Sequence, residues 1–153
     1  MSKSVHLIIV GKLKDSNLEA IEANYLQRIR EPELKIHEVK ARAQNKSSEG
    51  QEILKKISEI SKQTPSHIVA LTEFGKQYDS PEFSRQLFDL VDYKNRVIFL
   101  IAGAEGFSQD VLDKVDQKLS LSKMTFPHKL ARILFIEQFY RAITIKNNHP
   151  YHN

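Results

Sequence analysis

Runs of apolar residues alternate with amphipathic stretches along this chain. Short runs rich in β-branched and aromatic side chains predict four strands, at 5–10, 34–39, 67–72 and 96–101. A fifth segment, 119–122, predicts a short strand or an extended loop. The first, third and fourth strands are almost continuously apolar, which is typical of strands that are covered on both faces.

Between the strands, apolar residues recur at helical spacing. Helices are predicted over about 16–30, through 53–60 after an exposed polar loop at 40–48, from Ser80, from Ser108, and from Pro127 to about Lys146. Ser16 with Glu19 has the pattern of a capping box, and Ser80 is expected to cap a helix that has Pro81 in its first turn. The apolar stripe of the last helix is wide, so we expect burial on more than one side.

The alternation of strands and helices predicts an α/β fold, a largely parallel sheet with helices on both faces. Ligands of such sheets bind at the carboxyl ends of strands. The turns that follow Leu71, Ile101 and Leu121 are therefore the segments where we expect a site.

Length and composition limit the class of protein. The 153 residues, 41% hydrophobic and 27% charged, suit one globular domain spanning 1–153, with no repeat or linker. The absence of Cys excludes disulfides, thiol nucleophiles and Cys-bound metals, and it agrees with a reducing compartment. The apolar run after Ser4 is too short for a secretion signal or a membrane span. We expect a cytoplasmic protein without a membrane partner.

The basic charge is concentrated near the end of the chain. Residues 123–153 hold five Lys or Arg against one acidic residue, which accounts for the whole formal excess of +4. The same segment holds three of the six His. A local basic excess suits an acidic ligand or a nucleic acid.

Several common enzyme classes lack their motifs here. The turn at 10–14 has no G-x-G-x-x-G pattern, which disfavours a dinucleotide-binding domain. The sequence also has no phosphate-binding loop of the G-x-x-x-x-G-K-[ST] type, no G-x-S-x-G and no H-E-x-x-H. We expect no metal.

Two turns carry residues that suit close contact with a ligand. The segment 102–106 combines four small residues with Glu105, and small residues let a ligand approach the backbone. The segment 121–128 is rich in hydroxyls and leads into a helix that starts with Pro127. Taken singly, the first is equally explained as a tight turn, and the second as a strand-to-helix connection capped by Ser122 or Thr125.

Together with the C-terminal end of the chain, these segments resemble one family. The matching motifs are, in chain order, Glu105-Gly106, Ser120-Leu121-Ser122, Thr125, Pro127-His128, Arg132, Glu137-Gln138, Tyr140-Arg141-Ala142 and Asn148-His149-Pro150-Tyr151-His152. They are similar to bacterial H-type large-subunit rRNA methyltransferases, small SPOUT-class enzymes that methylate N3 of a pseudouridine in 23S rRNA. The sequence departs from the usual Gly-Gly-Pro-Glu-Gly at Ala102 and Ala104, and from an Asp that often follows the leucine at 71.

The resemblance implies a single SPOUT domain with a C-terminal trefoil knot within about 67–153, a homodimer, and S-adenosylmethionine as the cofactor. It implies 23S rRNA in the ribosome as the partner. The cofactor-binding positions that it carries over are Leu71, Ala102, Gly103, Leu121, Ser122, Lys123, Met124, Thr125 and Phe126. Gly103 is expected to touch the cofactor in a left-handed backbone conformation. A methyl group already activated on a sulfonium needs no protein nucleophile, which agrees with the absence of Cys and of a catalytic triad.

The catalytic group is left open by the sequence. The pyrimidine N3 must lose a proton, so a base or an anion stabiliser is needed. The candidates are His128, Arg132, Arg141, His149, Tyr151 and His152. Each has a structural alternative: both arginines are placed to pair with Glu137, His128 to cap or pack, and the tail to be a frayed terminus. His6, His37 and His67 flank strands and are expected to be structural.

Two other functions remain compatible with the sequence. One is a non-catalytic RNA- or ribosome-binding module with the SPOUT fold, for which Ala102 and Ala104 are the supporting departures. The other is a SPOUT methyltransferase that acts on tRNA, because a fold does not fix the substrate.

Overall fold

Strands and helices alternate along the chain. The computed structural model describes residues 3–94 and 96–153. The elements are β1 (Ser4–Val10), α1 (Ser16–Leu26), β2 (Glu33–Val39), α2 (Lys46–Ile60), β3 (His67–Gln77), α3 (Ser80–Tyr93), β4 (Val97–Ile101), α4 (Gln109–Leu112), β5 (Gln117–Ser120) and α5 (His128–Lys146). The predicted α/β class is confirmed.

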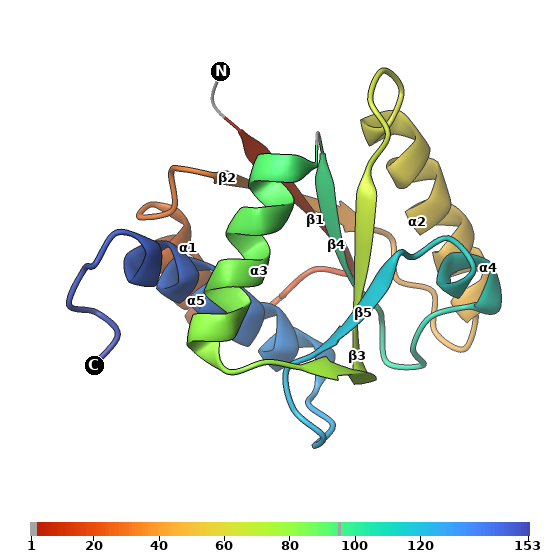
Figure 1. The fold of residues 1–153 in the computed structure, drawn as a ribbon. Helices are drawn as coiled ribbons and strands as arrows, with labels where there is room; N and C mark the ends of the chain where they lie inside the picture. The colour runs from red at the N-terminus through yellow and green to blue at the C-terminus, as the bar shows by residue number, and fades with distance from the viewer. Residues whose placement is uncertain (1–2, 95) are drawn as a thin grey trace.

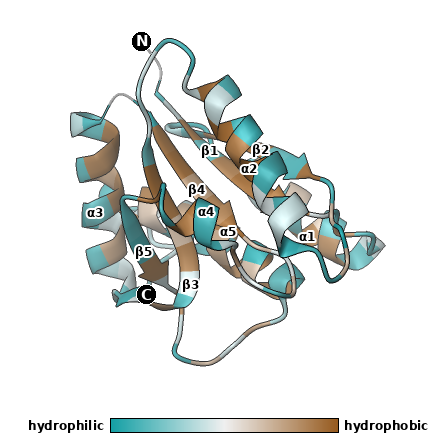
Figure 2. Cartoon of the chain, turned by 90° about the vertical axis from the view of Figure 1, so that its right-hand side faces the viewer, coloured by the Kyte–Doolittle hydropathy of each residue, from teal (hydrophilic) through white to brown (hydrophobic). Residues whose placement is uncertain are grey.

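The five strands form one parallel sheet in the order β2-β1-β4-β3-β5. Figure 1 shows α1, α3 and α5 on one side of this sheet, and α2 and α4 on the other. The central strands β1 and β4 are therefore covered on both faces, and every residue from Val5 to Val10 and from Val97 to Ile101 is buried. Figure 2 shows the hydrophobic residues concentrated along these strands. Burial on both faces is the reason that these strands are continuous apolar runs in the sequence.

Alternate residues of β1 face two separate cores, one on each side of the sheet. Val5, Leu7 and Ile9 of β1 face a core that α3 and α5 complete with aromatic side chains such as Phe83 and Phe135. Ile8 and Val10 face a smaller, aliphatic core under α2 and α4. The long helix α5 buries Phe135, Ile136 and Phe139 completely, which confirms that it lies deep in the fold. No helix of the described residues is long and apolar enough to cross a membrane.

Three helix starts differ from the sequence prediction, whereas Ser108 caps α4 as predicted. Asp15, not Ser16, caps α1, because its carboxylate accepts hydrogen bonds from the amides of residues 17 and 18. Asp79, not Ser80, caps α3, where it forms a capping box with Glu82. Helix α2 starts at Lys46 behind the cap Asn45, so the predicted loop at 40–48 ends early. In each of these helices, the side chain of the residue just before the first helical residue accepts the free amides of the first turn.

The edge of the sheet beside β5 is irregular. Strand β3 runs to Gln77, beyond the predicted end at 72, and β5 starts two residues before the predicted 119. Leu119 pairs with both Leu71 and Lys76, so residues 72–75 bulge out of the ladder. This bulge takes the place of the turn that we expected after Leu71.

His6 and His37 form a stacked pair between β1 and β2, which supports their expected structural role. Their rings lie 5.1 Å apart, and His6 Nδ1 is 2.8 Å from His37 Nε2, so one nitrogen donates and the other accepts. Burial, the neighbouring His37, Arg96 and Lys35 together lower the pKa of His6 from 6.5 to about 4, and burial also lowers the pKa of His37. The pair is therefore uncharged in the folded protein at neutral pH.

The buried pair makes stability depend on pH. The unfolded chain binds a proton at His6 below pH 6.5, whereas the folded chain does so only near pH 4. Between these values unfolding takes up protons, so the free energy of unfolding falls as the pH falls, by about 2–3 kcal/mol through His6. We expect urea unfolding between pH 7 and pH 4 to show this slope, and His6→Gln to reduce it. An unchanged slope in His6→Gln would contradict this assignment.

Candidate functional site

A cavity of about 890 Å³ opens at the carboxyl ends of β3, β4 and β5. Its lining comes from the segments that follow Leu71, Ile101 and Leu121, and from the start of α5. These are the three strand ends that the sequence indicated. The volume lies in the range of cavities that bind small molecules and cofactors.

The structure brings the predicted cofactor-binding residues together. Leu71, Ala102, Gly103, Leu121, Ser122, Met124, Thr125 and Phe126 all line the cavity. Lys123 does not line it, and its side chain is exposed. Thr72, Glu73 and Phe74 also line the cavity, although the sequence indicated the turn after Leu71 and none of these side chains individually. Their only signal was their position directly after the apolar run of β3.

Hydroxyl groups give the loop 121–126 its shape. Ser120 Oγ donates to the carbonyl of Ser122 at 2.8 Å, and Ser122 Oγ accepts from the amide of Met124 at 3.0 Å. Thr125 Oγ1 donates to the carboxylate of Glu73 in the bulge of β3. Neither Ser122 nor Thr125 caps α5, which starts behind Pro127 without a side-chain cap. The capping alternative for this segment is therefore wrong.

The turn 102–106 is packed tightly from behind. The carboxylate of Glu49 is buried and accepts the amide of Arg42 at 2.8 Å. A Cβ on Gly103 would lie 3.0 Å from Glu49 Oε1 and 3.2 Å from Val10 Cγ1. The left-handed backbone lies at Gly106, with φ of +81°, and not at Gly103 as expected. A side chain at 103 would therefore press on Glu49 and Val10, against which the turn closes.

Arg132 is buried in an ion-pair network that the sequence did not indicate. Its Nε and Nη2 donate to Glu22 at 2.6 and 2.9 Å, and its Nη1 donates to Glu38 at 2.7 Å. Burial alone would lower the pKa of Arg132, but the hydrogen bonds to Glu22 and Glu38 outweigh it and raise that pKa. The pairing of Arg132 with Glu137 is wrong, and Arg132 borders a smaller cavity of about 330 Å³ instead.

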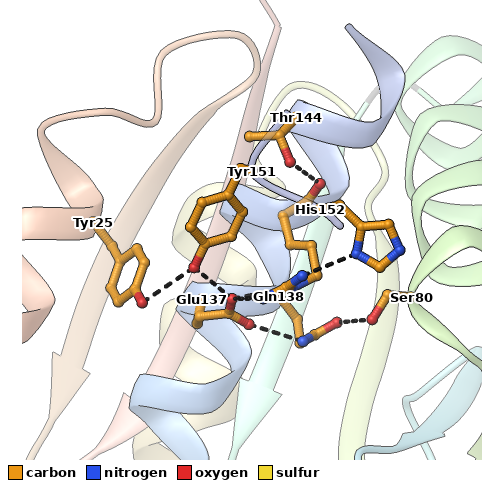
Figure 3. Close-up of polar contacts among 8 residues, drawn as sticks. Tyr25, Ser80, Glu137, Gln138, Thr144, Tyr151 and His152 are labelled. Atoms are coloured by element: carbon orange, nitrogen blue, oxygen red, sulfur yellow. Dashed lines mark hydrogen bonds and ion pairs between the residues drawn. The ribbon is translucent and has the colours of Figure 1, made fainter. Parts of the chain in front are cut away.

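The C-terminal tail folds back onto α5 (Figure 3). Arg141 pairs with Glu137 at 2.8 Å, as its spacing predicted. The Tyr151 hydroxyl donates to Glu137 at 2.8 Å and lies 3.3 Å from the Tyr25 hydroxyl. Arg141 Nη1 lies 2.9 Å from His152 Nδ1, which must accept because a guanidinium only donates.

Tyr151 is not part of a frayed terminus. Its ring packs edge to face on the ring of Tyr140, with the two centroids 4.8 Å apart. The Cζ atom of Arg141 lies 4.8 Å from the centroid of the Tyr151 ring. Burial, followed by the hydrogen bonds to Tyr25 and Glu137, raises the pKa of Tyr151. The phenol therefore stays protonated at neutral pH and is a poor proton acceptor.

His128 is the candidate catalytic residue that the structure places at the cavity. It is the first residue of α5, is half-buried, and lines the cavity next to Pro127. The cavity lining of the described residues does not include Arg132, Arg141, Tyr151 or His152 of this chain. His149 is exposed, and its Nδ1 accepts the amide of Tyr151.

The chain has a parallel α/β sheet with a cavity of cofactor size at three strand ends. Comparison of its sequence with known families identifies a class of proteins to which these features belong. Residues 3–152 match the model of the family described as predicted SPOUT methyltransferases. The chain belongs to the SPOUT methyltransferase family. The family resemblance found in the sequence is thereby confirmed.

Within this family, the curated relatives narrow the similarity further. A ribosomal RNA large subunit methyltransferase H from Exiguobacterium sp. is 38% identical over 97% of this chain and 99% of its own length. One from Bacteroides fragilis is also 38% identical, over 96% of this chain and 97% of its own length. The similarity therefore covers nearly the whole of each chain.

Solved structures share the fold at low sequence identity. A probable methylase family protein from Haemophilus influenzae has a TM-score of 0.59 at 11% identity, over 97% of this chain and 70% of that chain. The SpoU methyltransferase AviRb from Streptomyces viridochromogenes, solved in complex with the cofactor AdoMet, has a TM-score of 0.52 at 13% identity. This chain covers 58% of the AviRb chain, and 92% of this chain is matched.

The docked tail leads to a stability prediction. Deleting Tyr151–Asn153 removes an aromatic pair, a hydrogen bond to Glu137 and some buried surface, so we expect a loss of about 2–3 kcal/mol in the free energy of unfolding. Tyr151→Phe should lose about 1 kcal/mol, because only the hydroxyl is removed. Urea unfolding measures both, and deletion of Asn153 alone is the control. A tail deletion as stable as the full chain would mean that Tyr151 contributes nothing.

Proposed function

We propose that this protein transfers a methyl group from S-adenosylmethionine to N3 of a pseudouridine in 23S rRNA. The observation that carries the proposal is the convergence of the predicted cofactor residues of β3, β4 and β5 on one cavity. The full-length similarity to ribosomal RNA large subunit methyltransferases H supports the class of substrate. The AdoMet bound to AviRb supports the cofactor.

The lining of the cavity suits this cofactor. Leu71, Leu121 and Phe126 offer apolar surface for an adenine ring, and the turn 102–106 offers backbone groups to hydrogen-bond with it. Glu73 and Glu105 also line the cavity, and their negative charge suits a ligand with a sulfonium and an ammonium group. When bound, S-adenosylmethionine supplies a methyl group that is already activated for transfer.

The residues of this chain then position the base and remove its proton. The imidazole of His128 lies in the cavity lining, and imidazole is the side chain that most readily takes up a proton near neutral pH. We assign proton acceptance from N3 to His128 on this ground. Arg141 and His152 lie outside the lining in this chain, so any role in the reaction requires the cavity of a second subunit.

The proposal includes a homodimer and a C-terminal knot within about 67–153, as in the family that the sequence resembles. Leu130 and Leu134, one turn apart on α5, are 46% and 41% exposed, and Ile21 on the neighbouring α1 is 44% exposed. Three exposed aliphatic side chains on two packed helices suit a two-fold interface. We place the enzyme in the cytoplasm, where ribosomes are its partner.

The alternatives differ from this proposal in their ligands. A binding module without catalysis has no need of S-adenosylmethionine, and a tRNA methyltransferase has another RNA. Ala102 and Ala104 favour neither, because both lie in a turn that lines the cavity with small side chains. Measuring whether S-adenosylmethionine binds, and which RNA is methylated, therefore distinguishes the three functions.

Cofactor titration and methyl transfer test the proposed function. We expect calorimetry to show one S-adenosylmethionine site per chain, and labelled methyl groups to enter 23S rRNA of ribosomes from a strain that lacks this gene. His128→Asn should keep cofactor binding and lower the rate of transfer about 100-fold or more, because general base catalysis contributes roughly 10²–10⁴-fold. Mass mapping locates the methylated base. Absence of cofactor binding would support the binding module, and transfer to tRNA would support the second alternative.

The homodimer has a separate test. Sedimentation velocity at micromolar concentration should show a dimer for the natural sequence. Leu134→Glu should shift it to monomer, because a charge would be buried in the apolar contact, while the 41% exposure of Leu134 lets the subunit fold. Ser58→Glu, at an exposed position of α2 on the other side of the sheet, is the control that should remain dimeric. A monomeric natural protein would contradict the proposed interface.

A further inference from the structure

The bulge of β3 forms part of the rim of the cavity. Leu119 pairs with both Leu71 and Lys76, so the residues 72–75 leave the ladder at the end of the sheet where the cavity opens. Figure 1 shows β3 bending sharply at this end before the chain continues toward α3. Bulges next to binding sites commonly redirect a side chain. The side chain that this bulge presents is Phe74.

The bulge is held in place by close contacts. A Cβ on Gly75 would lie 2.6 Å from the amide nitrogen of Leu119, so only glycine permits this approach to β5. Thr72 Oγ1 accepts the amide of Phe74 at 3.3 Å. Glu73 accepts the hydroxyl of Thr125, which connects the bulge to the loop 121–126. The residues beside Phe74 are therefore each fixed to a neighbour.

Two large apolar side chains are exposed on the two connected segments. Phe74 is 86% exposed and follows Glu73, and Met124 is 75% exposed and precedes Thr125. Both line the cavity. A phenyl ring so exposed contacts little of the cavity interior, so it is poorly placed as a wall for the cofactor. It is well placed to contact a ligand that arrives from solvent.

Charges of both signs stand close to these side chains in the chain: Glu73 directly precedes Phe74, and lysines follow at 76, 123 and 129. Lys76 lies in the strand just beyond the bulge, Lys123 directly precedes Met124, and Lys129 is the second residue of α5. Exposed aromatic side chains near basic groups are the usual platforms on which unpaired nucleic acid bases stack. Met124 adds a flexible apolar surface beside such a platform.

We propose that Phe74, with Met124 beside it, stacks on an unpaired base of the RNA substrate next to the base that enters the cavity. The inference rests on the proposed function, because RNA is the substrate only if that function holds. It assigns to Phe74 substrate binding at the rim, outside the proton transfer and the cofactor contacts. Phe74 is thus a specificity-determining residue for a single-stranded segment of the RNA.

Binding of a labelled oligonucleotide tests this assignment directly. The probe is a fluorescein-labelled single-stranded RNA of about 20 nucleotides, with fluorescence anisotropy as the readout. We expect Phe74→Ala to weaken its binding about tenfold and Phe74→Tyr to bind as the natural protein does, because loss of base stacking costs roughly 5- to 150-fold in affinity. Phe74→Leu should be as weak as Phe74→Ala, and Met124→Ala should lose less. Tyr93→Ala is the control, since Tyr93 is 83% exposed at the other end of α3.

Enzyme kinetics, cofactor titration and sedimentation decide how a loss of oligonucleotide affinity is interpreted. In Phe74→Ala we expect KM for ribosomes to rise about tenfold, with a clearly smaller change in the Kd of S-adenosylmethionine, because the exposed ring meets the cavity only at its rim, and with an unchanged sedimentation coefficient. Unchanged oligonucleotide affinity, a loss of cofactor affinity as large as the loss for ribosomes, or conversion to monomer would each overturn the assignment. Failure of the natural protein to bind the cofactor or to methylate ribosomes would instead overturn the proposed function, and the oligonucleotide comparison would still decide the role of Phe74.

Discussion

One buried guanidinium ties the last helix to the N-terminal half of the chain. Arg132 of α5 joins Glu22 of α1 and Glu38 of β2, which lie 110 and 94 residues earlier in the chain. Burying a charge is strongly unfavourable unless its partners satisfy it, and removing one partner costs about 3–5 kcal/mol. Arg132 lies one turn after His128, so the same contact that holds α5 to the N-terminal half also places the start of α5 at the cavity. The fold and the site share this constraint.

The cavity itself follows from parallel topology. Three neighbouring strands β4, β3 and β5 end on one side of the sheet, and each is followed by a segment that lines the cavity. Contacts from behind hold these segments: Glu49 supports the turn at Gly103, and Leu119 supports the bulge at Gly75. The site is thus built from loops whose backbone the sheet and α2 already fix, which suits a reaction that depends on position and electrostatics.

The sequence predicted those features that local pattern determines. Continuous apolar runs indicated β1 and β4, because burial on both faces leaves no polar position, and the three strand ends followed from the parallel sheet. The extension of β3 was missed because Glu73, Gly75 and Lys76 show no alternation, and its cause is the pairing with β5. Long-range contacts were also beyond local pattern: spacing indicated the pairing of Arg141 with Glu137, but not the network of Arg132 or the docking of Tyr151 on Tyr25 and Tyr140.

These contacts limit which basic residues of the segment 123–153 can contact an RNA substrate. Five cations gave residues 123–153 their formal excess, but Arg132 and Arg141 are paired with Glu22, Glu38 and Glu137. Lys146 lies over the Phe88 ring near the end of α5, far along the helix from its start at the cavity. Lys123 and Lys129 are then the basic residues of this segment that stand next to cavity-lining residues in the chain. Two such charges supply limited affinity for phosphates, so recognition of the proposed RNA substrate must depend largely on shape and on apolar contact with bases.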